Sequence, residues 1–198
     1  MTAQEPPLTW LTASSMADLG ELTARWVIGE LEDTPIHGGP PDDETRPLIP
    51  LLAAVNRSGF VTDFSQPGNA AWEQRATICG YCDDATCDVL AAAFAPTDVI
   101  LLHERGDSGI RVPVTLDQGK PFTWVGGAPA LDVWVSETTD AAVRALEASW
   151  YVTIVDPVWG RDDRLWPLLA TALGLASVSG SPGPAIGPTA PAADRRTG

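Results

Sequence analysis

The pattern of apolar and polar positions predicts helices and strands that alternate along most of the chain. Leu19, Leu22 and Trp26 recur at helical spacing, so we predict a helix over residues 14–31. Ser15, followed three residues later by an aspartate, resembles a capping box and marks the start of this helix. A polar loop that contains proline separates this helix from the next apolar pattern.

A second helix is predicted from Glu44 to Gly59. Leucines recur on one face of this segment, Pro47 suits a first helical turn, and a glycine is a common stop signal. The apolar residues that follow predict a short strand over 60–64, closed by a proline turn over 65–68.

Further alternation continues to the end of the apolar sequence. The predicted elements are a strand over 72–82, a helix from Asp83 or Asp84 to Phe94, paired strands over 98–103 and 111–116, a helix from Thr138 or Thr139 to Glu147, a strand over 150–155, and a last helix capped by Asp162 or Asp163. Residues 117–131 give no clear prediction because glycines and prolines interrupt the pattern. The alternation predicts an α/β (mixed α+β) fold, a single domain with a mixed sheet covered by helices.

Composition sets the domain limits and narrows the class of partner. We expect an N-terminal extension over 1–13, one globular domain over 14–176, and a disordered tail over 177–198 that is rich in proline, glycine and alanine. The formal net charge is −14, which disfavours nucleic acid and anionic membranes as partners. With no signal-peptide pattern and no apolar run of membrane-spanning length, we expect a cytoplasmic protein.

Residues with catalytic or metal-binding chemistry are few. Cys79, Cys82 and Cys87 have the spacing of a partial metal site, but a tetrahedral zinc would need a fourth ligand from His37 or His103. We therefore expect the cysteines to be small buried apolar groups, with no metal bound. Either histidine could instead be a simple surface or strand-end residue.

The segment from Glu44 to Pro67 is rich in groups that could contact a small molecule. It combines a helix N-terminus next to a carboxylate and a hydroxyl with a strand that ends in hydroxyl residues. From the residues alone, helix capping and turn formation are the favoured explanation of these polar groups.

Three blocks of this sequence resemble the C-terminal regulatory domain of eukaryotic methylenetetrahydrofolate reductase. Residues 56–67, NRSGFVTDFSQP, match its N-R-x-G and T-x-x-S-Q-P signature, and Glu44-Thr45 lies at the family's spacing upstream. Gln74-Arg75-Ala76 and Thr153-Ile154-Val155-Asp156-Pro157 are similar to its later blocks. The sequence also resembles an actinobacterial domain family of unknown function that shares the first motif.

The reductase domain binds S-adenosylmethionine or S-adenosylhomocysteine, so the resemblance implies an adenosyl ligand. The positions that match its ligand contacts are Glu44, Thr45, Thr62, Ser65 and Thr153. A further ligand threonine of that family has no direct counterpart, because the matching position is Asp140. A chain of 198 residues leaves no room for the reductase barrel, so no reductase activity is expected.

The resemblance thus predicts a stand-alone, non-catalytic domain that senses an adenosyl compound and signals through a protein partner or a homodimer. One alternative is an acidic protein–protein interaction module that keeps the fold without the ligand. A second alternative is an enzyme acting on a nucleoside-type substrate, with Asp63, Asp156 or His103 as acid or base.

Overall fold

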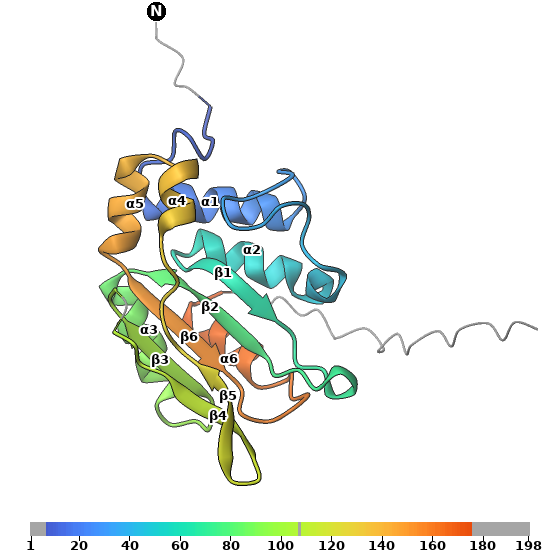
Figure 1. The fold of residues 1–198 in the computed structure, drawn as a ribbon. Coiled ribbons are helices and arrows are strands. Elements are labelled where there is room, and N and C mark those ends of the chain that lie inside the picture. Colours follow the sequence, from blue (N-terminus) through green and yellow to red (C-terminus); the bar gives the residue numbers. More distant parts are fainter. Residues whose placement is uncertain (1–6, 107, 176–198) are drawn as a thin grey trace, which may run out of the picture.

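A central antiparallel sheet lies between two groups of helices in the computed structural model, which describes residues 7–106 and 108–175 (Figure 1). In chain order the elements are α1 (Met16–Val27), the 3₁₀ helix η1 (Asp43–Leu48), α2 (Ile49–Arg57), β1 (Val61–Gln66), η2 (Ala70–Trp72), β2 (Thr77–Cys82), α3 (Asp84–Phe94), β3 (Ile100–Glu104), β4 (Val112–Asp117), β5 (Lys120–Val125), α4 (Asp132–Glu137), α5 (Asp140–Glu147), β6 (Trp150–Val155) and α6 (Leu165–Ala172). The prediction of a single, mixed α+β domain is confirmed.

The sheet has the strand order β1-β2-β6-β3, and every neighbouring pair is antiparallel. We predicted a mixed sheet, and this detail is wrong. Strands β1 and β2 follow one another in the chain and form a hairpin. Strand β6 lies between β2 and β3, although β4, β5, α4 and α5 separate it from β3 in the sequence. No parallel crossover is therefore formed.

Each face of the sheet has its own apolar core. On one face Ile78, Val152 and Ile154 pack against apolar side chains of α2, α3 and α6. On the other face Tyr81 and Tyr151 belong to a cluster with α1, α4 and α5. Residues of the central strands β2 and β6 therefore alternate between two buried environments, which explains why these two strands are mainly apolar.

Local signals placed several element ends correctly. The Ser15 hydroxyl accepts a hydrogen bond from the Asp18 amide at 3.1 Å, and the Asp18 carboxylate accepts one from the Ser14 amide at 2.8 Å. Asp83 and Thr139 cap α3 and α5 in the same way. These three helix starts confirm the predictions made from capping residues.

Other boundaries differ from the prediction for identifiable reasons. Helix α1 ends at Val27 rather than at residue 31. The helix predicted from Glu44 is 3₁₀ until Leu48, because Pro50 lacks an amide hydrogen and its ring clashes with the carbonyl four residues earlier. The predicted strand over 72–82 shortens to β2, since η2 ends at Trp72, Glu73 is left-handed and Gln74 forms an isolated bridge with Asn69.

The last helix and the predicted turn after β1 are linked by Asp162. We expected Asp162 or Asp163 to cap α6, but the residue before α6 is Arg164 and makes no side-chain cap. The Asp162 carboxylate instead accepts hydrogen bonds from the Gly68 amide and the Trp166 indole, each at 2.7 Å. Strand β1 also runs through Gln66, two residues into the predicted turn.

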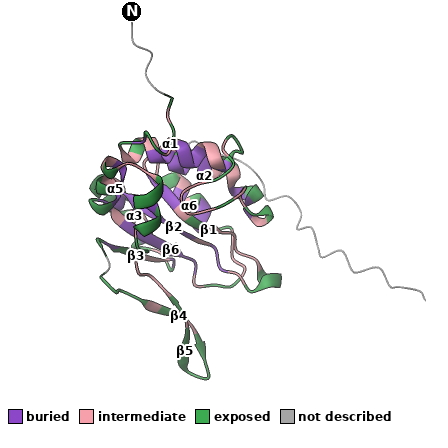
Figure 2. Cartoon of the chain, turned by 45° about the horizontal axis from the view of Figure 1, so that its top comes forward, coloured by how far each residue is buried: buried purple, intermediate pink, exposed green. Residues whose placement is uncertain are grey.

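The β4–β5 hairpin extends away from the body of the domain (Figure 2). We expected the strand over 111–116 to pair with the strand over 98–103, and this pairing is wrong: β4 pairs with β5, whereas β3 pairs with β6. The two-residue turn Gln118-Gly119 has positive φ at both positions, 49° and 79°, as a type I′ hairpin turn requires.

The domain begins before the predicted boundary at Ser14. Ala13 is fully buried, and Leu8 and Trp10 pack against the cluster that contains α1. The tail predicted over 177–198 lies outside the described residues. Of the helices that the structure describes, none combines the length and apolar character needed to cross a bilayer.

Candidate functional site

The five residues implied by the resemblance occupy three separate regions. Glu44 and Thr45 lie in η1, where the Glu44 carboxylate accepts a hydrogen bond from the Gln74 side-chain amide at 2.9 Å and Thr45 is buried. Ser65 is half-buried near the end of β1. Helix η1 contacts β1, so the elements that carry these three residues are neighbours.

Thr62 is already hydrogen-bonded inside the protein. Its amide donates to the Asn56 side-chain oxygen at 2.9 Å, and its hydroxyl accepts from the Asn56 side-chain nitrogen at 2.9 Å. The same Asn56 nitrogen donates to the Leu52 carbonyl at 2.8 Å, and Asn56 is 1% exposed. This network joins α2 to β1 and gives Thr62 a structural role.

Thr153 lies on the opposite face of the sheet from Thr62. Thr62 is in register with Gly80, whereas Thr153 is in register with the next residue of β2, Cys79. Successive strand residues point to opposite faces, so the two threonine side chains are separated by the sheet. The five residues therefore do not converge on one site, and they do not line the two pockets described below.

The deeper pocket lies on the α1, α4 and α5 side of the sheet and has a volume of about 360 Å³. Tyr81 of β2 and Tyr151 of β6 are register partners and form part of its lining, with ring centroids 5.1 Å apart at an interplanar angle of 64°. Leu146 at the end of α5 adds an apolar side. We call this site the Tyr81 pocket.

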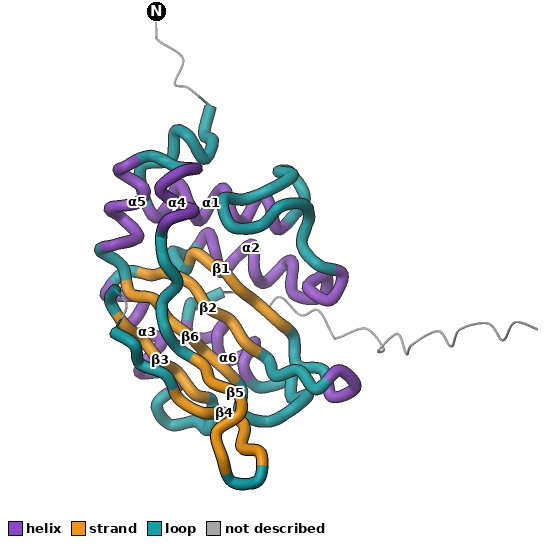
Figure 3. The backbone as a smooth tube through the Cα atoms, in the orientation of Figure 1, coloured by secondary structure: helices purple, strands orange, loops and turns teal. Residues whose placement is uncertain are grey.

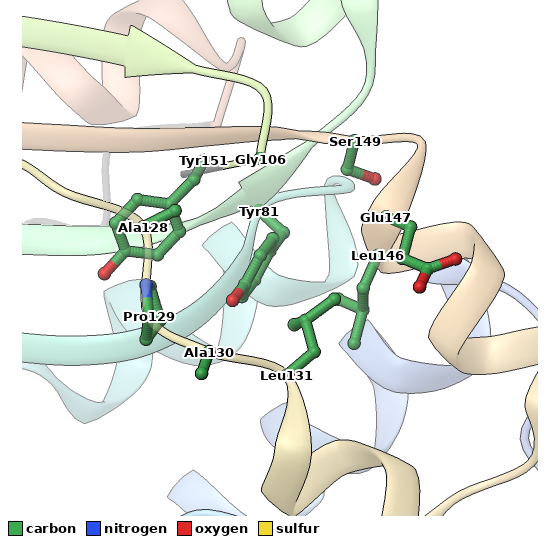
Figure 4. Close-up of a pocket in the computed structure, with 10 residues that line it drawn as sticks. All are labelled: Tyr81, Gly106, Ala128, Pro129, Ala130, Leu131, Leu146, Glu147, Ser149 and Tyr151. Carbon is green, nitrogen blue, oxygen red and sulfur yellow. The ribbon is translucent and has the colours of Figure 1, made fainter. Parts of the chain in front are cut away.

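A loop encloses the Tyr81 pocket from the front. Residues 128–131 leave the β4–β5 hairpin, run past Tyr81 and Tyr151, and lead into α4 (Figure 3; Figure 4). Glu147 and Ser149 lie at the side of the pocket near the end of α5. The lining therefore combines two tyrosine rings and aliphatic groups with a few polar atoms, which is typical of small-molecule sites.

A buried carboxylate holds two of the surrounding loops together. Glu104, at the end of β3, is 5% exposed. It accepts hydrogen bonds from the amides of Gly127 at 2.8 Å and Ser108 at 3.0 Å, and from the Ser108 hydroxyl. This fixes the start of the 128–131 loop relative to Gly106, so the pocket wall is ordered without a ligand.

The two tyrosine hydroxyls differ in their partners. The Tyr151 hydroxyl donates to the Asp63 carboxylate at 3.0 Å. The Tyr81 hydroxyl is buried and has no hydrogen-bond partner among the described residues, although the whole side chain is only 3% exposed. Burial, followed by the nearby Asp63 charge, raises the pKa of Tyr81, so this hydroxyl remains protonated and can donate.

Asp63 lies behind Tyr151 as the extra residue of a bulge in β1. Burial raises the pKa of its carboxyl to about 6, while the Tyr151 hydrogen bond and the His37 charge oppose this shift. His37 contacts the Asp63 carbonyl through Nε2 at 2.7 Å and stacks on Trp26. These contacts give His37 and Asp63 structural partners.

A family model matches residues 6–176 of this chain. The chain belongs to that family, which is described as a domain of unknown function (DUF6919). The DUF6919 match includes both sheet cores, the hairpin and every residue of the Tyr81 pocket. No curated protein matches the chain.

The second pocket in this DUF6919 domain is a shallower site near the start of the described chain. It has a volume of about 370 Å³ and lies between Trp10 and the loop at Asp33, beside Val133 of α4. The Trp10 indole donates to the Asp33 carbonyl at 3.3 Å. None of the residues that line it has a buried side-chain polar atom without a hydrogen-bond partner.

The other candidate chemical groups of the DUF6919 domain have structural partners. Cys87 Sγ lies 3.0 Å from His103 Nδ1, and burial raises the pKa of the Cys87 thiol, which is the opposite of what a nucleophile needs. Asp156 is fully buried and accepts hydrogen bonds from the Val158 amide and from Arg161. Within residues 7–106 and 108–175, no group of three histidine, cysteine or acidic side chains could hold a metal ion.

Sequence reasoning missed Tyr81 and Tyr151 as site residues. The alternation of side chains along strands 77–82 and 150–155 assigns each tyrosine to one face of its strand. Only the pairing register of the two strands places the two rings opposite one another. The order β2-β6 links strands about 70 residues apart, and the closing loop belongs to the segment that gave no prediction.

Proposed function

We propose that this DUF6919 domain binds a small molecule in the Tyr81 pocket and does not itself catalyse a reaction. The ligand class that we propose is an adenosyl compound, such as S-adenosylmethionine or S-adenosylhomocysteine. A protein partner or a second copy of the chain would then respond to the bound state.

The observation that most supports binding is the buried Tyr81 hydroxyl without a partner. Leaving such a donor unpaired costs about 1–3 kcal/mol, which a ligand that accepts its hydrogen bond would recover. Tyr81 lines a pocket whose volume, about 360 Å³, is within the range of small-molecule sites, and a ligand there reaches the buried hydroxyl only if the surrounding side chains move apart. A preformed wall at residues 128–131 further lowers the cost of ordering the site.

The adenosyl class rests on the sequence resemblance and on the chemistry of the lining. A purine is flat and has ring nitrogens that accept hydrogen bonds, so it suits two tyrosine rings and one free donor. The neighbourhood of Glu44, Thr45 and Ser65 is the competing location that the resemblance implies.

Titration calorimetry with S-adenosylmethionine and S-adenosylhomocysteine tests both parts of the proposal. In wild-type protein we expect saturable binding, and in Tyr81→Phe we expect about tenfold weaker binding, because only the donor is lost. Tyr81→Phe should not lower the free energy of unfolding, since the hydroxyl has no partner in the folded protein.

Ser65→Ala is the matched control, because it also removes one hydroxyl but lies outside the pocket. Binding that is lost in Ser65→Ala and retained in Tyr81→Phe would contradict the proposed location. No heat with either compound at millimolar concentration would remove the adenosyl class.

A second candidate function is protein–protein interaction through the β4–β5 hairpin. Phe122 is 72% exposed, and Leu116 and Trp124 are also exposed on this projecting element (Figure 2). Exposed apolar groups that gather on one element are typical of interaction surfaces. The net charge of −14 favours a basic partner over an acidic one.

A further inference from the structure

The charges around the Tyr81 pocket have one sign. Glu147 is an exposed residue at the side of the pocket, with its carboxylate turned away from the two tyrosine rings (Figure 4), and the lining contains no lysine, arginine or histidine. Asp63 adds a second carboxylate directly behind Tyr151. A ligand in this pocket therefore meets negative potential with no cationic side chain to offset it.

The nearest basic side chains lie outside the pocket lining. Arg105 is adjacent to Gly106, but its guanidinium lies over the Trp150 ring at 4.6 Å and pairs with Asp84. Arg111 lies against the backbone of Gly127 and does not line the pocket. An anionic ligand would thus be desolvated without a countercharge.

The two tyrosine rings add an electron-rich surface to this negative field. Aromatic rings attract cations through their negative faces. The Tyr151 hydroxyl donates to the Asp63 carboxylate, and this hydrogen bond increases the electron density of the ring. Tyr81 lies edge to face against Tyr151 in the same wall.

We propose that the Tyr81 pocket selects an organic cation, with an ammonium or sulfonium centre against the tyrosine rings and the Glu147 carboxylate adding negative potential at the side of the pocket. This inference rests on the binding function proposed above and deepens it by specifying the charge of the ligand. Both adenosyl compounds carry an amino-acid ammonium group, and S-adenosylmethionine adds a positive charge on sulfur, so the inference predicts that it binds more tightly than S-adenosylhomocysteine.

A pair of probes with the same shape isolates the effect of charge. Choline contains a trimethylammonium group, and 3,3-dimethylbutan-1-ol replaces its nitrogen with carbon. We expect choline to bind wild-type protein about tenfold more tightly than the alcohol, as cation–π and carboxylate contacts together imply. Glu147→Gln should reduce this ratio severalfold without changing the affinity for the alcohol, because glutamine keeps the shape and removes the charge.

Glu73→Gln is the matched control, since Glu73 is an exposed carboxylate outside the pocket and its removal changes the net charge equally. The ratio should be unchanged in this variant. Equal binding of choline and the alcohol to wild-type protein, or no choline binding at millimolar concentration, would overturn cation selectivity.

The adenosyl titrations separate this inference from the proposed function. If both adenosyl compounds bind equally and Tyr81→Phe weakens both, the pocket remains the binding site and only the cation proposal fails. If neither compound binds and neither probe binds, the proposed function fails together with the inference.

Discussion

Two hydroxyl groups in this domain differ in how their hydrogen-bonding needs are met. The Thr62 hydroxyl, which the motif implies as a ligand contact, is paired with Asn56 in a buried network. The Tyr81 hydroxyl, which no motif indicated, has no partner within the part of the chain that the structure describes. The folded environment of each residue therefore decides which hydroxyl remains available to bind a ligand. A threonine within a recognisable motif can equally form hydrogen bonds inside the protein.

Asp63 makes the stability of the domain depend on pH. Its pKa rises from 3.8 in an unperturbed chain to about 6 in the folded protein, so the folded state binds the proton more tightly than the unfolded state. The free energy of unfolding should therefore fall as pH rises from about 4 to 6, and then level off. The decrease amounts to about 2 to 3 kcal/mol.

Asp63→Asn removes this titration and keeps an oxygen that can accept from Tyr151. Denaturant unfolding at pH 4 and pH 7 measures this effect. The free energy of unfolding of the variant minus that of wild type should be larger at pH 7 than at pH 4 by about 2 to 3 kcal/mol. Asp88→Asn, on the exposed face of α3, is the control and should show a constant difference. A constant difference for Asp63→Asn as well would contradict the assignment.

The β4–β5 hairpin forms a two-stranded sheet of its own, separate from the four-stranded sheet. Arg75 attaches it to the body: its guanidinium donates to the Val114 carbonyl at 3.0 Å and the Thr115 hydroxyl at 2.9 Å, and lies over the Trp159 ring. Beyond this attachment the strands contact mainly each other. Such an element contributes little to the domain core.

The double variant Phe122→Ser, Trp124→Ser tests this view of the hairpin. Both side chains are exposed, so the free energy of unfolding should change by less than about 1 kcal/mol. If the hairpin joins two copies of the chain, sedimentation should show a concentration-dependent dimer for wild type and a monomer for the variant. A wild-type protein that stays monomeric at all concentrations would contradict self-association through this hairpin.

Secondary-structure signals predicted most elements but not their partners. Capping residues located three helix starts, and the apolar run over 150–155 located β6 with its observed bounds. The hairpin was only half predicted, because Pro113 and Pro121 interrupt its strands and Gln118-Gly119 is a weaker turn signal than Asn-Gly. Strand pairing depends on long-range packing, which a local pattern does not contain.

At the scale of the whole molecule, the two cores explain why the predicted site does not form. A sheet covered on both faces separates side chains that lie on adjacent strand positions, as with Thr62 and Thr153. The same arrangement places the tyrosine pair at an edge of one core. The segment that connects β3 to β6 passes this edge as the 128–131 loop. The fold class follows from alternation along the chain, whereas the pocket follows from topology.

Chemical-shift mapping with S-adenosylmethionine tests the central claim most directly. On titration of ¹⁵N-labelled protein, the largest amide shifts are predicted at Gly106, Ala128, Ala130 and Leu131, with Tyr81 and Tyr151 among those affected. Shifts concentrated at Glu44, Thr45 and Ser65, or no shifts at millimolar ligand, would contradict binding in the Tyr81 pocket.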